Sequence, residues 1–96
     1  MTARFPRHQL YSLTSQMQRA AVSVPANIAE GFCRRRFRDK ARFYNIAEGS
    51  AAELKYYFIL ARKLSYLTGS CPLPEVLEEV RRMLRALVNA TLAGPV

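Results

Sequence analysis

The sequence is poor in the residues that build metal sites and disulfide frameworks. Its 96 residues include two cysteines, Cys33 and Cys71, and one histidine, His8. A structural zinc site needs about four thiolate, imidazole or carboxylate ligands at characteristic spacings, and the chain has no Cys-x-x-Cys pair. We therefore predict that the protein binds no metal and needs no other cofactor. We also expect both cysteines to be free thiols that are buried or half-buried.

Arrangements of residues that carry out catalysis are also missing. His8 lies in a proline-containing segment without an obvious partner, and Gly31 and Gly49 do not form a Gly-rich nucleotide-binding pattern. Glu30 and Glu48 lie in separate stretches that lack the Glu-x-x-His motifs of a bundle metal site. Glu30 is better placed to pair with Arg34, one helical turn further on. The sequence predicts that the protein is not an enzyme.

Long apolar runs are missing as well. A membrane-spanning helix needs about 20 apolar residues, and charged residues interrupt every candidate segment, at Arg19, Glu30, Glu53 and Lys55. The N-terminal residues lack the long apolar core of a secretory signal. We expect a cytoplasmic protein that makes no contact with membranes. Its length predicts one domain over residues 1–96, with a polar segment at 1–9 and a tail at 93–96.

Acidic residues are scarce, and this scarcity sets the charge of the protein. Seven acidic residues stand against fifteen basic ones, which gives a net charge of +8. Arginine provides a planar set of donors that suits phosphate and also stacks on bases, and a net positive charge attracts polyanions. The densest basic segment predicts a nucleic-acid-binding site made of Arg34, Arg35, Arg36, Arg38, Lys40 and Arg42. The alternative is a solvated surface in which codon bias has favoured arginine.

One aromatic residue, Phe37, lies within this basic segment. It either stacks on a base or anchors the segment inward, and anchoring is the favoured interpretation.

Apolar residues recur at helical spacing in three stretches, which predict helices at 10–31, 39–67 and 73–92. No stretch alternates with a period of two for long. We therefore predict an all-α fold, an up-down helical bundle. Pro25 interrupts the first stripe, so that helix should bend near Ser23–Pro25 or restart there. Six residues at the centres of the stripes should be largely buried: Met17, Val24, Ala47, Leu54, Val80 and Leu84.

The pentapeptide Asn-Ile-Ala-Glu-Gly occurs twice, at residues 27–31 and 45–49. Repeat architectures have periods of about 20–50 residues and several copies, and a third copy is missing here. Either the repeated pentapeptide arose by chance, or its small residues pack in a similar way at two helix crossings.

Several stretches carry a resemblance to a known family. They are residues 13–31, LTSQMQRAAVSVPANIAEG, and residues 42–50, RFYNIAEGS, followed by Glu53-Leu54 and by residues 64–67, LSYL. In these stretches the chain resembles the bacterial four-helix-bundle family that is also called the 23S rRNA intervening-sequence protein family. The resemblance extends over roughly residues 5–92.

The resemblance implies a cytoplasmic up-down bundle that assembles as a ring-like homopentamer. It also implies kinship with the accessory variability determinant of diversity-generating retroelements, a basic pentamer that binds nucleic acid and a reverse transcriptase. Members of the family carry a helix before the segment that matches Phe5-Pro6, where this chain has only four residues. The resemblance therefore implies that the first helix of the bundle is missing here, or that the start codon is placed too late. Three helices would leave one apolar groove uncovered and favour self-association.

Together these features predict a non-catalytic oligomeric bundle that binds nucleic acid, RNA or DNA, through its arginine-rich surface as an accessory or scaffold. A reverse transcriptase or another protein is a possible further partner. Two alternatives stay open: a protein–protein interaction module whose basic face meets an acidic partner, and a structural fragment with no nucleic-acid ligand.

Overall fold

The computed structural model describes residues 7–64 and 72–94. Within these two ranges the chain forms three helices and no strand: α1 (Arg7–Cys33), α2 (Phe37–Lys63) and α3 (Leu73–Leu92). The predicted all-α class is confirmed. The bounds of α3 agree with the prediction, α1 is longer at both ends, and α2 begins two residues earlier. Leu64 is a turn residue, and the remainder of the predicted second helix, residues 65–67, lies outside the described residues.

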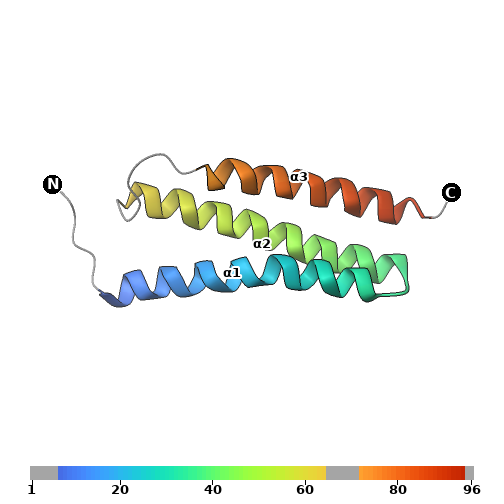
Figure 1. Cartoon of the computed structure of the whole chain (residues 1–96), viewed down its shortest axis with the longest axis horizontal. Coiled ribbons are helices and arrows are strands. Elements are labelled where there is room, and N and C mark those ends of the chain that lie inside the picture. The colour runs from blue at the N-terminus through green and yellow to red at the C-terminus, as the bar shows by residue number, and fades with distance from the viewer. Residues whose placement is uncertain (1–6, 65–71, 95–96) are drawn as a thin grey trace.

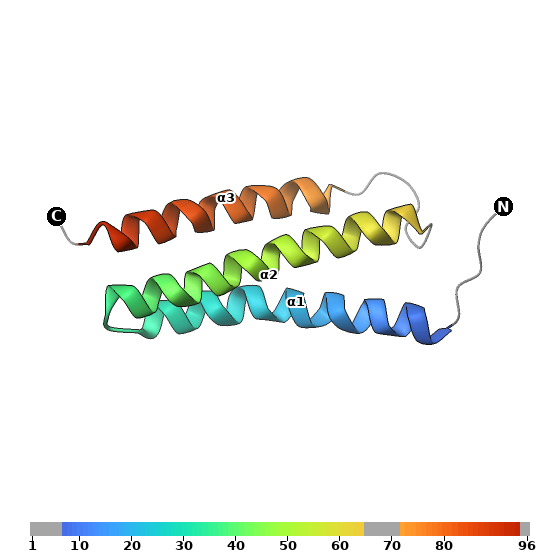
Figure 2. The same cartoon turned by 180° about the vertical axis from the view of Figure 1, so that it is seen from behind.

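The three helices run up and down as one open layer (Figure 1). α2 lies in the middle and packs against α1 on one side and α3 on the other, whereas α1 and α3 have no close backbone approach of their own. The Cα atoms extend over 58 × 23 × 12 Å, so the layer is long and thin. Figure 2 shows the same order from behind, with the α1–α2 turn at one end and the C-terminal end of α2 beside the N-terminal end of α3 towards the other. The C-terminal end of α3 lies at the end that holds the α1–α2 turn.

Small side chains on α2 allow both neighbours to pack closely. Ala41 and Ala61 are buried along α2. One core cluster joins Ala20, Leu54 and Leu77, one residue from each helix, with Met17 and Phe58 packed against it. A second cluster, between α2 and α3, contains Ala41, Tyr44 and Val88. The core therefore consists of two separate clusters.

Half of the predicted core residues are buried. Ala47, Leu54 and Leu84 are buried, whereas Met17, Val24 and Val80 are half-buried. These three lie on the flanking helices, and a single layer leaves part of each flanking helix uncovered.

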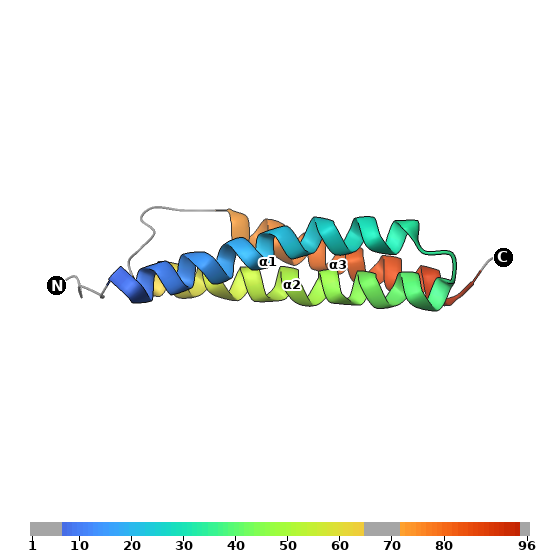
Figure 3. The same ribbon diagram turned by 90° about the horizontal axis from the view of Figure 1, so that it is seen from below.

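α1 is continuous through Pro25, so of the two predicted outcomes, a bend or a restart, the restart does not occur. Pro25 cannot donate a hydrogen bond to the carbonyl of Ala21, and α1 changes direction gently along its length in Figure 3. Near the proline, the side-chain Nδ2 of Asn27 donates to the Ser23 carbonyl at 2.8 Å and to Ser23 Oγ at 2.9 Å. Ser23 Oγ is also hydrogen-bonded to Ser50 Oγ of α2 at 2.6 Å.

The expectation that Cys33 is at least half-buried is wrong. It is an exposed free thiol, because it ends α1 next to a turn that α2 does not cover. Cys71 lies outside the described residues. No described helix combines the length and the apolar character needed to cross a membrane.

Candidate nucleic-acid interface

The predicted basic residues lie on the α1–α2 turn and the first turns of α2, which together we call the tip (residues 32–43). Residues 34–36 connect the two helices, a length typical of an antiparallel helix pair. Arg36 is extended, with φ −85° and ψ 135°, and no side chain caps the start of α2. Of the six predicted site residues, five are exposed and Lys40 is half-buried.

Lys40 joins the two helices. Its Nζ donates to the carbonyl of Phe32 at 2.9 Å and to the carbonyl of Gly31 at 3.3 Å. These carbonyls belong to the last turn of α1, where the helix has no further backbone donors and where a positive charge is favourable. Lys40 therefore holds the turn in place, and its ammonium group is already engaged.

Arg34 is held by two neighbours. Its Nη2 lies 2.6 Å from Glu30 Oε2, which confirms the predicted pairing one helical turn apart. Its guanidinium carbon lies 4.8 Å from the centre of the Phe43 ring, and that of Arg42 lies 6.0 Å from the same centre. Contacts of this kind attract the cation to the ring, so Phe43 orients two of the arginines.

In the described part of the chain, four arginines of the tip have no carboxylate partner. Across residues 7–64 and 72–94, no acidic side chain lies within ion-pair distance of Arg35, Arg36, Arg38 or Arg42. All four are exposed. The tip therefore presents guanidinium groups that can bind an incoming anion without breaking an ion pair.

Two phenylalanines accompany these arginines. Phe37 has 44% of its surface exposed, so it is partly covered and partly accessible to a ligand. Phe32 has 76% exposed, and the sequence analysis did not identify it. Its position two residues before the first arginine of the basic run was the signal that could have found it.

The arginines of α3 have a different environment. Glu48 of α2, with 8% of its side chain exposed, accepts from Arg81 Nη1 at 3.2 Å and from Arg85 Nη2 at 2.7 Å. Burying this carboxylate requires paired charges, and the two arginines supply them. These guanidinium groups connect α3 to α2 and are not free for a ligand.

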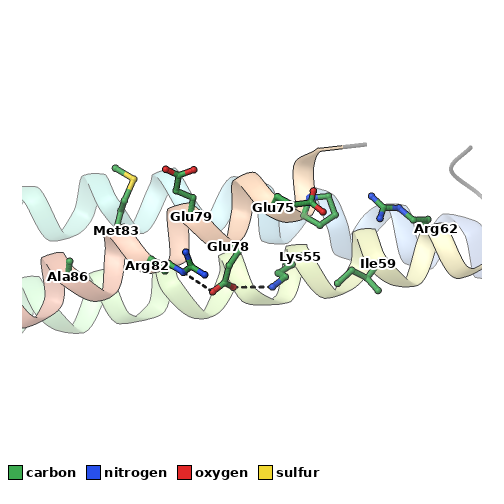
Figure 4. Close-up of a pocket in the computed structure, with 10 residues that line it drawn as sticks. Lys55, Ile59, Arg62, Glu75, Glu78, Glu79, Arg82, Met83 and Ala86 are labelled. Carbon is green, nitrogen blue, oxygen red and sulfur yellow. Dashed lines mark hydrogen bonds and ion pairs between the residues drawn. The ribbon is translucent and has the colours of Figure 1, made fainter. Parts of the chain in front are cut away.

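A depression of about 820 Å³ lies over α2 and α3, and Figure 4 shows its charged lining. Glu78 accepts from Arg81 at 2.6 Å and from Lys55 at 3.0 Å, and it lies 3.6 Å from Arg82. The hydrogen bond from Arg81, followed by that from Lys55, lowers the pKa of Glu78 from 4.5 to about 2. The same pairing raises the pKa of Arg81 above its ordinary value. Glu78 is ionised at neutral pH and cannot act there as a proton donor.

An apolar groove of about 580 Å³ lies near the end of the layer opposite the tip. All three helices line it, with Leu10, Met17, Leu54, Phe58 and Leu73 among the lining residues. The uncovered groove expected of three helices is therefore present. The molecule has a cationic tip at one end and an apolar groove near the other.

These features define a class of protein: in its described residues, an all-helical, up-and-down, basic protein with a cluster of exposed arginines at one end. The chain belongs to the 23S rRNA-intervening sequence protein family, which it matches over residues 1–87. No curated protein matches the chain significantly.

Proposed function

We propose that this protein is a non-catalytic, oligomeric accessory or scaffold protein of the cytoplasm that binds nucleic acid, RNA in the first place, through the tip. The observation that carries the proposal is the group of four exposed arginines, Arg35, Arg36, Arg38 and Arg42, for which the described residues supply no carboxylate partner. The family name refers to ribosomal RNA, which supports RNA as the ligand.

Binding would be electrostatic and weakly selective for sequence. Each unpaired guanidinium can neutralise about one phosphate and release its counterion, so the logarithm of affinity falls as the logarithm of salt concentration rises, by about 0.9 per duplex phosphate and about 0.7 per single-strand phosphate. Phosphate contacts carry no direct sequence information. Lys40 and Arg34 contribute by holding the tip in shape.

A matched pair of double variants tests this proposal. Arg35→Ala with Arg36→Ala removes two charges from the tip, and Arg7→Ala with Arg19→Ala removes two from exposed positions of α1 outside it. We expect the tip variant to bind duplex RNA more weakly and to lower the salt slope by about 2, with a smaller change in the control. Circular dichroism checks that both variants are folded. Equal weakening in both would assign binding to the overall charge, and no change in either would contradict the proposal.

We further propose that the protein self-associates through its apolar groove, with the ring-like pentamer implied by the family resemblance as the expected assembly. Leu10 and Leu73 line the groove and are exposed in the single chain, and covering apolar surface is favourable by about 25 cal/mol per Å². Leu10→Asp with Leu73→Asp should reduce the mass measured by light scattering, whereas Val22→Asp, outside the groove, should not. A folded wild-type monomer at micromolar concentration would contradict the proposal.

In the alternative function, an acidic protein partner would meet the same arginines; a reverse transcriptase is a separate proposed partner. A competition experiment shows which surface a protein partner binds. Excess RNA should displace a partner that is bound at the tip, and a partner that is bound in the groove should stay bound.

A further inference from the structure

The tip carries two exposed aromatic residues, Phe32 and Phe37, that are not members of the core clusters formed by the described residues. Phe32 lies in the last turn of α1 and Phe37 begins α2, so the two phenylalanines flank the arginine turn. Their exposed fractions are 76% and 44%. Apolar surface left in water is unfavourable, and neither ring belongs to a core cluster.

Phe32 is also held in place. Lys40 Nζ lies 5.5 Å from the centre of the Phe32 ring, and the same nitrogen donates to the Phe32 carbonyl. One cation therefore restrains both the backbone and the ring. A ring that is restrained and still exposed loses less freedom when a flat ligand stacks on it.

The neighbouring charges indicate what that flat ligand is. Exposed arginines adjoin the two phenylalanines in the chain, and their guanidinium groups favour a polyanion. A nucleic acid offers phosphates for the guanidinium groups and bases for the rings. In a duplex, both faces of each base are stacked on neighbours, so the rings can reach bases only in single strands, loops and ends.

We infer that the tip prefers unpaired nucleotides over duplex because Phe32 and Phe37 stack on bases while the adjacent arginines bind phosphates. The inference rests on the proposed function and deepens it, because it names the class of nucleic acid. The arginines bind the phosphates of single strands and duplexes alike, and the two rings add affinity for single strands only. Base–aromatic stacking changes affinity by about tenfold per ring.

The test measures affinity by fluorescence anisotropy for one RNA sequence, first as an unstructured 12-nucleotide strand and then paired in a duplex. Phe32→Leu with Phe37→Leu keeps apolar side chains and removes the aromatic faces. We expect affinity for the single strand to fall at least tenfold and affinity for the duplex to stay the same. Tyr11→Leu is the matched control, because Tyr11 has the same exposed fraction as Phe32, 76%, and lies on α1 far from the tip. It should change neither affinity.

The arginine and phenylalanine variants separate the two claims. If Arg35→Ala with Arg36→Ala weakens both RNAs while the leucine variant changes neither, this inference is overturned and the proposed function stands. If neither variant affects binding, the proposed function itself fails. If the leucine variant lowers the oligomeric mass and leaves binding to single strands unchanged, the rings belong to a protein interface and the inference is overturned.

Discussion

Gly31 and Gly49 occupy the same place in two copies of one pentapeptide, but their surroundings differ. A Cβ atom on Gly31 would lie 2.6 Å from Tyr44 Cε1 and 3.1 Å from the Lys40 carbonyl oxygen. A Cβ atom on Gly49 would meet nothing within 4 Å. Similar packing at two helix crossings therefore does not explain the repeated pentapeptide. Gly31 allows α1 and α2 to approach next to the tip, whereas Gly49 is exposed.

Alanine substitution at these two glycines should have opposite effects. Gly31→Ala forces the Tyr44 ring to move and should destabilise the fold by about 1–3 kcal/mol. Gly49→Ala replaces a poor helix former without a new contact and should stabilise by about 0.5–1 kcal/mol. Urea unfolding of both variants measures the difference, and an equal change of the same sign in both would contradict it.

Glu78 should make the folding stability of the protein depend on pH in the acidic range. Its folded pKa of about 2 lies below the ordinary value of 4.5, so its ion pairs stabilise the fold above the ordinary value. That stabilisation is lost as pH falls from about 4.5 through about 2. Compared with wild type, Glu78→Gln should lower the melting temperature at pH 7, and the difference should shrink towards pH 2. Glu79→Gln, at an exposed position beside it, is the control and should show no such convergence.

At the scale of the elements, α2 is the helix on which the fold depends. Leu54, with 8% of its surface exposed, lies in the cluster that joins α2 to both α1 and α3. Glu48 and Lys55 on the same helix bind arginine and glutamate of α3. The outer helices have no close backbone approach to each other, so each depends on α2 for its place.

Leu54→Ala should therefore destabilise the whole protein by about 2–5 kcal/mol, the range for removing a buried leucine side chain. Val22→Ala, at a position that is 66% exposed, should change stability by about 0.5 kcal/mol or less. Denaturant unfolding followed by circular dichroism compares the two. A loss well below 1 kcal/mol for Leu54→Ala would show that the centre of the layer is not tightly packed.

At the scale of the whole molecule, the arginine-rich tip and the apolar groove are separated. The tip lies at one end of a layer that is 58 Å long, and the apolar groove lies near the other. Electrostatic binding is weakened by salt, whereas burial of apolar surface is not screened. A protein built in this way can use the groove for assembly while the tip stays free for a ligand.

Salt should therefore separate the two proposed activities. Raising the salt concentration from 50 to 500 mM should abolish most binding of RNA to the tip, while the mass measured by light scattering should stay the same. The groove variant should behave in the opposite way, with reduced mass and with each chain keeping its affinity for a short RNA. Dissociation of the assembly by salt alone would show that charged contacts hold it together.

Features that depend on neighbouring positions in the chain could be predicted from the sequence. The spacing of apolar residues determined three helices and the all-α class, and the bounds of α3 agree with the prediction. The pair Glu30–Arg34 followed from helical geometry alone, since side chains four residues apart lie on one face. The basic residues of the tip were also visible, because they are close together in the chain.

Only the tertiary structure decided which of the arginines are free. Arg85 meets Glu48 across 37 residues of chain, and Lys55 meets Glu78 across 23, and no local pattern predicts such pairs. Three other features also depend on how the helices pack. They are the hydrogen bonds from Lys40 to the end of α1, the exposure of Phe32, and the different surroundings of Gly31 and Gly49. Helical periodicity determines the face of a helix on which a residue lies, but the surroundings of that face depend on how the helix axes are placed relative to one another.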